Sequence, residues 1–181
     1  MPDSTVPDRL LSDLEQLAQS NGPLALCLES ALDTVLRAFD CQAGTVHWLD
    51  PSCGMLSLRA LRGIPDTMLA RIQLIPLGKG MAGIAAQRRE PLQVCNLQTD
   101  GSGVARPAAK ETRMEGAIAV PILEGEHLRG TLGIGKTVPY EFSAAESELL
   151  MQAAAKLARI LAGSSSTLTR SASEKLASPS G

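Results

Sequence analysis

Two pairs of alternating segments in the middle of the chain constrain its fold more than any other feature. The first pair, residues 45–49 and 55–61, is separated by the turn-rich stretch 50–54. The second pair, residues 116–123 and 127–135, surrounds a short connection that contains glycine. Two-residue alternation on both sides of such a connection predicts an antiparallel β-hairpin. The centre of the chain is therefore expected to form an antiparallel sheet.

Helical periodicity precedes the first hairpin. Residues 8–19 place leucines on one helical stripe, and Asn21-Gly22-Pro23 ends that segment. A second helix is expected over residues 23–39, because its apolar residues share one face opposite Glu29 and Asp33. That apolar face is expected to pack against the sheet.

The last helix has the clearest sequence signature. Ser143 and Glu146 form a capping box, and Gly163 is a suitable C-terminal stop. Apolar residues cover about 240° of this helix, whereas one contact needs a stripe of about 100°. The helix is therefore expected to have two apolar neighbours. One is the sheet, and the other is either an N-terminal helix of the same chain or the matching helix of a second copy.

Between the hairpins the elements are short. We expect a helical segment near residues 65–71, and a strand over 72–77 that Pro76 limits to a sheet edge or a strand end. A glycine-rich turn then leads into a helix over 84–88, and a short strand follows over 92–95. Residues 96–113 form an 18-residue loop with little apolar content, and loops of this length usually have a function, so we expect this one to determine specificity.

Charge and composition exclude several classes of protein. The chain has 181 residues and a net charge of -2, which gives no general attraction to nucleic acid or to anionic lipid. Asp3 and Asp8 stand where a signal peptide needs positive charge, and no apolar run is long enough to span a membrane. A cytoplasmic protein with neither nucleic acid nor a membrane as partner is expected. Residues 164–181 are rich in serine and lack periodicity, which predicts a disordered tail.

Five segments, together with their order and spacing, carry a family resemblance. They are LGKGMAG (77–83), PLQVCNL (91–97), AVPIL (119–123), LRGTLGI (128–134) and FSAAESELL (142–150). Over residues 22–163 the chain resembles a GAF domain, with residues 1–21 as a leader helix. The resemblance implies an α+β, GAF/PAS-like fold with a central antiparallel sheet of five to six strands. It also implies N- and C-terminal helices on one face, and a pocket with short helices and a long loop on the other.

The resemblance implies a sensory or regulatory module without catalytic activity. It is expected to bind a small molecule or a partner, to form a homodimer through its terminal helices, and to signal in trans to an output protein. No particular cofactor or metal is indicated. The expected ligand-binding residues are Gly80, Met81, Asn96, Arg106, Lys110, Arg113 and Glu115. The three cations of the loop could receive a carboxylate or a phosphate, although a solvated loop would have the same composition.

The glycines at positions 78, 80 and 83 also satisfy the GxGxxG pattern of dinucleotide-binding folds. That fold needs parallel strands joined by a helix, whereas hairpins flank this motif. We therefore expect the glycines to allow a tight turn into a short helix, whose first amides could hold an anionic group.

The alternative to a non-catalytic module is a small redox enzyme or thiol sensor that is related to free methionine-(R)-sulfoxide reductase and uses Cys95. The positions of the cysteines and histidines help to judge it. Ala82 stands where that family has a resolving cysteine, and residues 96–118 contain no cysteine. We expect Cys95 to be a small buried residue and all cysteines to be reduced, with no disulfide between Cys41 and Cys53. His47 and His127 are expected at the surface, without haem or bilin.

Overall fold

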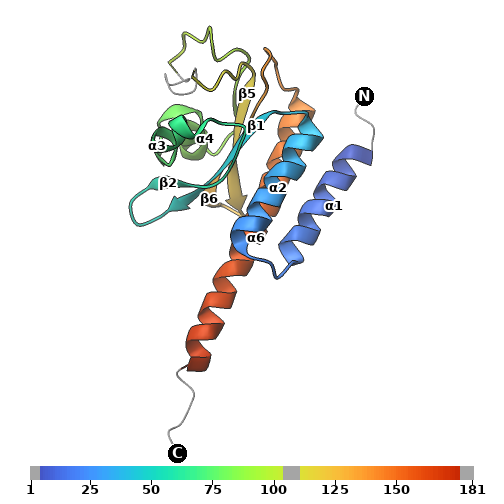
Figure 1. Cartoon of the computed structure of the whole chain (residues 1–181), viewed down its shortest axis with the longest axis vertical. Helices are drawn as coiled ribbons and strands as arrows, with labels where there is room; N and C mark the ends of the chain where they lie inside the picture. The colour runs from blue at the N-terminus through green and yellow to red at the C-terminus, as the bar shows by residue number, and fades with distance from the viewer. Residues whose placement is uncertain (1–4, 104–110, 176–181) are drawn as a thin grey trace, which may run out of the picture.

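The structure is a computed structural model and describes residues 5–103 and 111–175, with the side chains described up to residue 162. The described residues form one six-stranded sheet and helices on both of its faces (Figure 1). The helices are α1 (Thr5–Gln19), α2 (Leu24–Phe39), the short 3-10 turn η1 (Asp66–Met68), α3 (Leu69–Ile72), α4 (Gly80–Arg88) and α6 (Ala144–Lys175). The strands are β1 (Ala43–Asp50), β2 (Met55–Arg62), β3 (Leu74–Pro76), β4 (Leu92–Val94), β5 (Ala117–Glu124) and β6 (His127–Gly135).

The sheet is antiparallel throughout, in the order β3-β2-β1-β6-β5-β4. Both predicted hairpins are confirmed, with β1 paired to β2 and β5 paired to β6. The two hairpins meet where β1 pairs with β6 at the centre of the sheet. Pro76 lies in the edge strand β3, as predicted, where its missing N–H group leaves no ladder bond unmade.

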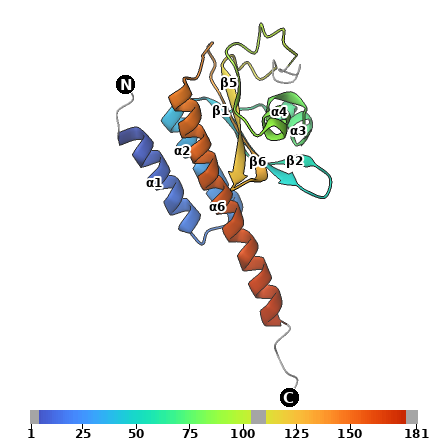
Figure 2. The same ribbon diagram turned by 180° about the vertical axis from the view of Figure 1, so that it is seen from behind.

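Three helices form a layer on one face of the sheet. Helices α2 and α6 lie against the strands, and α1 packs on the outside against both of them (Figures 1 and 2). Leu10 and Leu14 of α1 are buried in the same core as Val35 of α2, Val120 of β5 and Leu157 of α6. The second apolar neighbour of α6 is therefore an N-terminal helix of the same chain. No described helix is long and apolar enough to cross a membrane.

The capping box of α6 is confirmed. The Glu146 N–H donates to Ser143 Oγ at 3.2 Å, and the Ser143 N–H donates to Glu146 Oε2 at 2.8 Å. The predicted helix end at Gly163 is wrong, because α6 continues to Lys175. A glycine in a helix costs only about 1 kcal/mol, and extending an existing helix adds one hydrogen bond per residue. Most of the expected tail is thus helical, and residues 176–181 lie outside the described part.

Lys136 joins the end of β6 to the end of α2. This lysine is 7% exposed, and its Nζ donates to the carbonyl oxygens of Phe39 at 2.6 Å and Asp40 at 2.8 Å. The ammonium also lies 4.7 Å from the centroid of the Tyr140 ring. A cation at the C-terminal end of a helix satisfies carbonyls that have no partner within the helix. Lys136 therefore fixes the helical layer to the centre of the sheet.

Helices α3 and α4 cover the opposite face of the sheet, beside β3 and β5 (Figure 1). The sequence pattern placed the start of α4 at Ile84, but the helix begins at Gly80. Gly83 explains the close contact between α4 and β3, since a Cβ atom at this position would lie 2.3 Å from the Pro76 carbonyl oxygen. Gly78 and Gly80 have positive φ values, which confirms the expected tight turn, whereas the helix–strand packing at Gly83 was not expected. The antiparallel sheet excludes the dinucleotide-binding fold.

Candidate functional site

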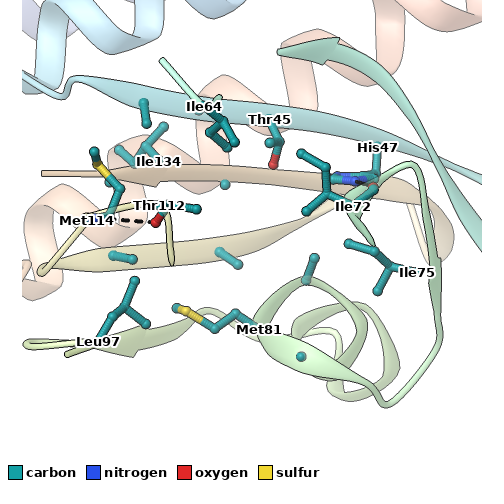
Figure 3. A pocket seen from close by; sticks show the side chains of 18 of the residues that line it. Thr45, His47, Ile64, Ile72, Ile75, Met81, Leu97, Thr112, Met114 and Ile134 are labelled. Carbon is teal, nitrogen blue, oxygen red and sulfur yellow. Dashed lines mark hydrogen bonds between the residues drawn. The ribbon is translucent and has the colours of Figure 1, made fainter. Parts of the chain in front are cut away.

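A cavity of about 170 Å³ lies between the sheet and helices α3 and α4 (Figure 3). Strands β1, β5 and β6 form its floor, and α3, β3 and α4 form much of its wall. An apolar cavity of about 150 Å³ holds a molecule of the size of benzene. In this conformation the cavity is therefore suited to a small compound.

The floor exists because small residues occupy the cavity-facing positions of three neighbouring strands. Strand β5 contributes Ala117 and Ala119, which pair with Gly135 and Gly133 of β6, and Gly135 pairs in turn with Ala43 of β1. Because side chains alternate between the faces of a strand, Ile118, Leu132 and Ile134 belong to the core beneath the helices, and Ile118 and Ile134 also border the cavity. The alternation of small and large residues in β5 and β6 is a sequence signal for this cavity.

Most of the wall is apolar. Six large side chains from five separate segments surround the floor (Figure 3): Ile64, Ile72, Ile75, Met81, Leu97 and Met114. Two of them are methionines, whose unbranched side chains adapt easily to the shape of a neighbour. Thr45 and Thr112 add hydroxyl groups to this lining. A cavity of mainly apolar character with a few polar groups is typical of small-molecule sites.

His47 is the most deeply buried polar group of the site, at 1% exposure, so the expectation of a surface histidine is wrong. Position 47 belongs to the sheet face against which the end of α3 lies, and this long-range packing is not visible in the strand pattern. The Nε2 atom lies 2.8 Å from the Ile72 carbonyl oxygen, so it carries the proton and donates. Burial lowers the pKa of His47, although the bond to Ile72 opposes this. The ring is therefore neutral, and its Nδ1 is an acceptor without a partner in the described residues.

The start of α4 also faces the cavity. Lys79, Gly80, Met81 and Ala82 all line it, and no side chain caps this end of the helix. Arg71 also lines the cavity and forms an ion pair with Glu111. The amide groups and Lys79 give the part of the cavity at the start of α4 a positive potential.

A protein-family model described as GAF domain matches residues 24–162. The chain belongs to the GAF domain family. Solved structures agree with this assignment at the level of the fold. The GAF domain of a phosphoenolpyruvate-protein phosphotransferase from Coxiella burnetii has a TM-score of 0.78 and 20% identity, with coverage of 92% of this chain and 99% of that one.

Other solved structures are similar as well. The GAF domain of the Acinetobacter phosphoenolpyruvate-protein phosphotransferase has a TM-score of 0.74 and 20% identity, covering 91% of this chain and 97% of that one. Free methionine-R-sulfoxide reductase from Neisseria meningitidis, in complex with its substrate, has a TM-score of 0.72 and 15% identity, covering 92% of this chain and 96% of that one. No curated protein matches the chain. At these identities the similarity extends to the fold alone.

The GAF domain brings only part of the predicted site together. Gly80 and Met81 line the cavity. Asn96, Arg113 and Glu115 do not line it. Asn96 accepts a hydrogen bond from the Gln98 N–H at 2.9 Å, and the Glu115 carbonyl accepts one from the Leu97 N–H. Arg113 is exposed and has a φ of 60°. Arg106 and Lys110 lie outside the described residues. Ligand binding by these positions stays a prediction, whereas His47, Thr45 and the small-residue floor were missed.

The cysteines of the GAF domain lie away from the cavity. All four are free, as predicted, and none of them lines it. Cys95 is exposed, so the expectation that it is buried is wrong: it follows the last residue of the edge strand β4. Burial raises the pKa of the Cys41 thiol to about 12, which keeps it protonated and unreactive. Within the described ranges, no group of three His, Cys, Asp or Glu residues could hold a metal ion.

Proposed function

We propose that this GAF domain is a cytoplasmic sensory module that binds a small molecule in the cavity above β1, β5 and β6. Binding then regulates an output protein in trans, without catalysis by the GAF domain itself. The observation that carries the proposal is the mainly apolar cavity over a floor of small residues, with the buried Nδ1 of His47, which has no partner among the described residues, in its wall. A floor without large side chains leaves space that a ligand can fill.

The placement of the thiols favours binding over redox turnover. A reductase mechanism needs a thiolate that reaches the substrate and a second thiol that resolves the oxidised form. Ala82 lines the cavity at the position expected for the second thiol, and the exposed Cys95 does not line it. The redox alternative therefore has the fold in common with the reductases but lacks thiols beside the bound molecule.

Strand β5 supports the proposed route from the cavity to the helices. Ala117 and Ala119 face the cavity, whereas Ile118, Val120 and Ile122 enter the core, and α6 packs against this strand. A shift of β5 on ligand binding would therefore reach α6 through direct packing. Close-packed interiors transmit such displacements because they have few voids to absorb them.

We also propose that two copies associate through their terminal helices. The part of α6 beyond residue 162 runs away from the sheet, and in the described ranges no other element lies beside it (Figures 1 and 2). Short helices without packing partners are marginally stable in water. A second copy that packs against this segment would stabilise it.

Ligand binding is tested by a small-molecule screen monitored by NMR of the ¹⁵N-labelled protein. Compounds that bind are expected to shift the amide resonances of β5, β6 and α4, and then those of α6. The variant Ala119→Ile fills the floor and is expected to weaken these compounds at least tenfold. Ala155→Ile makes the same substitution at an exposed position of α6 and should leave binding unchanged. The proposal fails if no compound shifts cavity resonances, or if both variants behave alike.

A further inference from the structure

The charged side chains of the cavity are all cationic. Arg71 and Lys79 line it, and no acidic side chain of the described residues does. The charge of Arg71 is partly balanced by Glu111, with which it forms an ion pair. Lys79 has no acidic partner within the part of the chain that the structure describes, and it stands directly before α4. A ligand with one negative charge would be balanced here, whereas a cationic ligand would not.

The start of α4 supplies amide donors beside Lys79. The amides of Gly80, Met81 and Ala82 precede the first bonded amide of the helix, since the Gly83 N–H donates to the Lys79 carbonyl at 3.2 Å. No side chain caps these donors, and their residues line the cavity. Free amides and the helix dipole together favour a carboxylate or phosphate oxygen.

His47 places a second and independent requirement on the ligand. Its ring is 99% buried in the cavity wall beside Ile72 (Figure 3), with Nδ1 as an acceptor that has no described partner. A buried acceptor without a donor costs about 1–3 kcal/mol, and a ligand hydroxyl that reaches it would remove this cost. An ammonium group is a poorer match because none of the described residues that line the cavity has a carboxylate to balance its charge.

The size and apolarity of the cavity limit the rest of the ligand. Its volume of about 170 Å³ exceeds only slightly that of a cavity for benzene. A second carboxylate would lie among isoleucine and methionine side chains, where an unpaired charge is strongly unfavourable. The body of the ligand is therefore small and apolar.

We infer that the ligand is a small hydroxy monocarboxylate with an apolar body, whose carboxylate lies at the start of α4 and whose hydroxyl donates to His47. This inference rests on the proposed function, because it describes the occupant of the same cavity. It names Lys79 and His47 as the residues that determine ligand class.

The test uses isothermal titration calorimetry with 2-hydroxy-3-methylbutanoate as the probe. Its neutral amide, 2-hydroxy-3-methylbutanamide, is expected to bind at least tenfold more weakly, and so is 3-methylbutanoate, which lacks the hydroxyl. Lys79→Gln should weaken the acid severalfold and leave the amide unchanged. Arg88→Gln removes a cation from the last turn of the same helix and should change neither affinity.

The outcomes separate this inference from the proposed function. If the amide binds as tightly as the acid, or if Lys79→Gln and Arg88→Gln weaken the acid equally, the inferred ligand class is wrong, while the cavity remains a binding site. If the acid produces no heat at millimolar concentration, the inference is also wrong. The proposed function fails with it only when the NMR screen finds no compound of any charge.

Discussion

His47 connects the two sides of the cavity through one hydrogen bond. The ring belongs to β1, and its Nε2 donates to the carbonyl of Ile72, the last residue of α3. The bond therefore holds the segment before β3 against the sheet. Because burial lowers the pKa of His47, the folded protein binds a proton here less readily than the unfolded chain does.

This lowered pKa predicts that the free energy of unfolding decreases as the pH is lowered through a defined range. The contribution of neutral His47 to the free energy of unfolding is complete above the ordinary histidine pKa of 6.5. It is lost as the pH falls from there towards the lower pKa that His47 has in the folded protein. We expect a loss of up to about 2 kcal/mol in the free energy of unfolding between pH 7 and pH 5. Urea denaturation at pH 7 and at pH 5 measures this loss.

The control variants for this prediction are histidine replacements. His47→Gln keeps a donor for Ile72 but does not titrate, so its stability should be nearly constant over this range. His127→Gln removes a histidine that is exposed at the β5–β6 turn and should retain the pH dependence of the natural chain. An equal dependence in His47→Gln and the natural chain would contradict the prediction.

At the scale of elements, α4 is positioned by its contact with β3. The Gly83 carbonyl accepts from the Gly78 N–H at 2.7 Å, which closes the glycine-rich turn. Gly78 has a φ of 77°, a conformation that other residues adopt only with strain. The turn and the glycine of α4 thus place the start of this helix at the cavity.

Gly83→Ala is expected to destabilise the fold. The new Cβ atom would lie 2.3 Å from the carbonyl oxygen of Pro76, and backbone atoms must shift to make room. Such overpacking costs about 1–3 kcal/mol, which urea denaturation can detect. Gly101→Ala is the matched control, because no atom lies within 4 Å of its added Cβ and its φ is not positive. Equal stability of the two variants would show that α4 tolerates displacement from β3.

The elements that the sequence predicted well are those with local signals. Alternation and turn residues gave both hairpins, and the Ser143–Glu146 capping box gave the start of α6. The errors concern packing between distant segments. His47 lies in an alternating strand like a surface residue, and it is buried where the end of α3, 25 residues further on, lies against it. Cys95 and Gly163 are similar cases, since exposure at a sheet edge and continuation of a helix depend on their surroundings.

At the scale of the whole molecule, the sheet separates two layers with different compositions. The helical layer has a large core of leucine, valine and alanine, whereas the opposite face has a smaller cluster around Leu97 and Met114. Stability should therefore reside mainly on the helical side. The cavity side, with less buried apolar surface, is better able to adjust to a ligand.

The proposed association predicts the mass in solution. Light scattering at tens of micromolar should give twice the chain mass of 19.0 kDa. A chain ending at Ala162 should be monomeric and still folded, because the core residues of α6 end at Leu161, and its melting temperature should fall only by the part that association contributes. A full-length chain that is monomeric at this concentration would remove the argument for helix pairing. A shortened chain that remains dimeric would move the interface to another surface.

In the proposed signalling, the end of α6 would act as a lever. Thirteen residues beyond Ala162 extend the helix by about 20 Å at a rise of 1.5 Å per residue. A tilt of about 5° at the sheet would therefore displace Lys175 by nearly 2 Å. The length of the helix amplifies small rearrangements. An output protein that contacts the end of α6 would therefore detect displacements that are barely measurable next to the sheet.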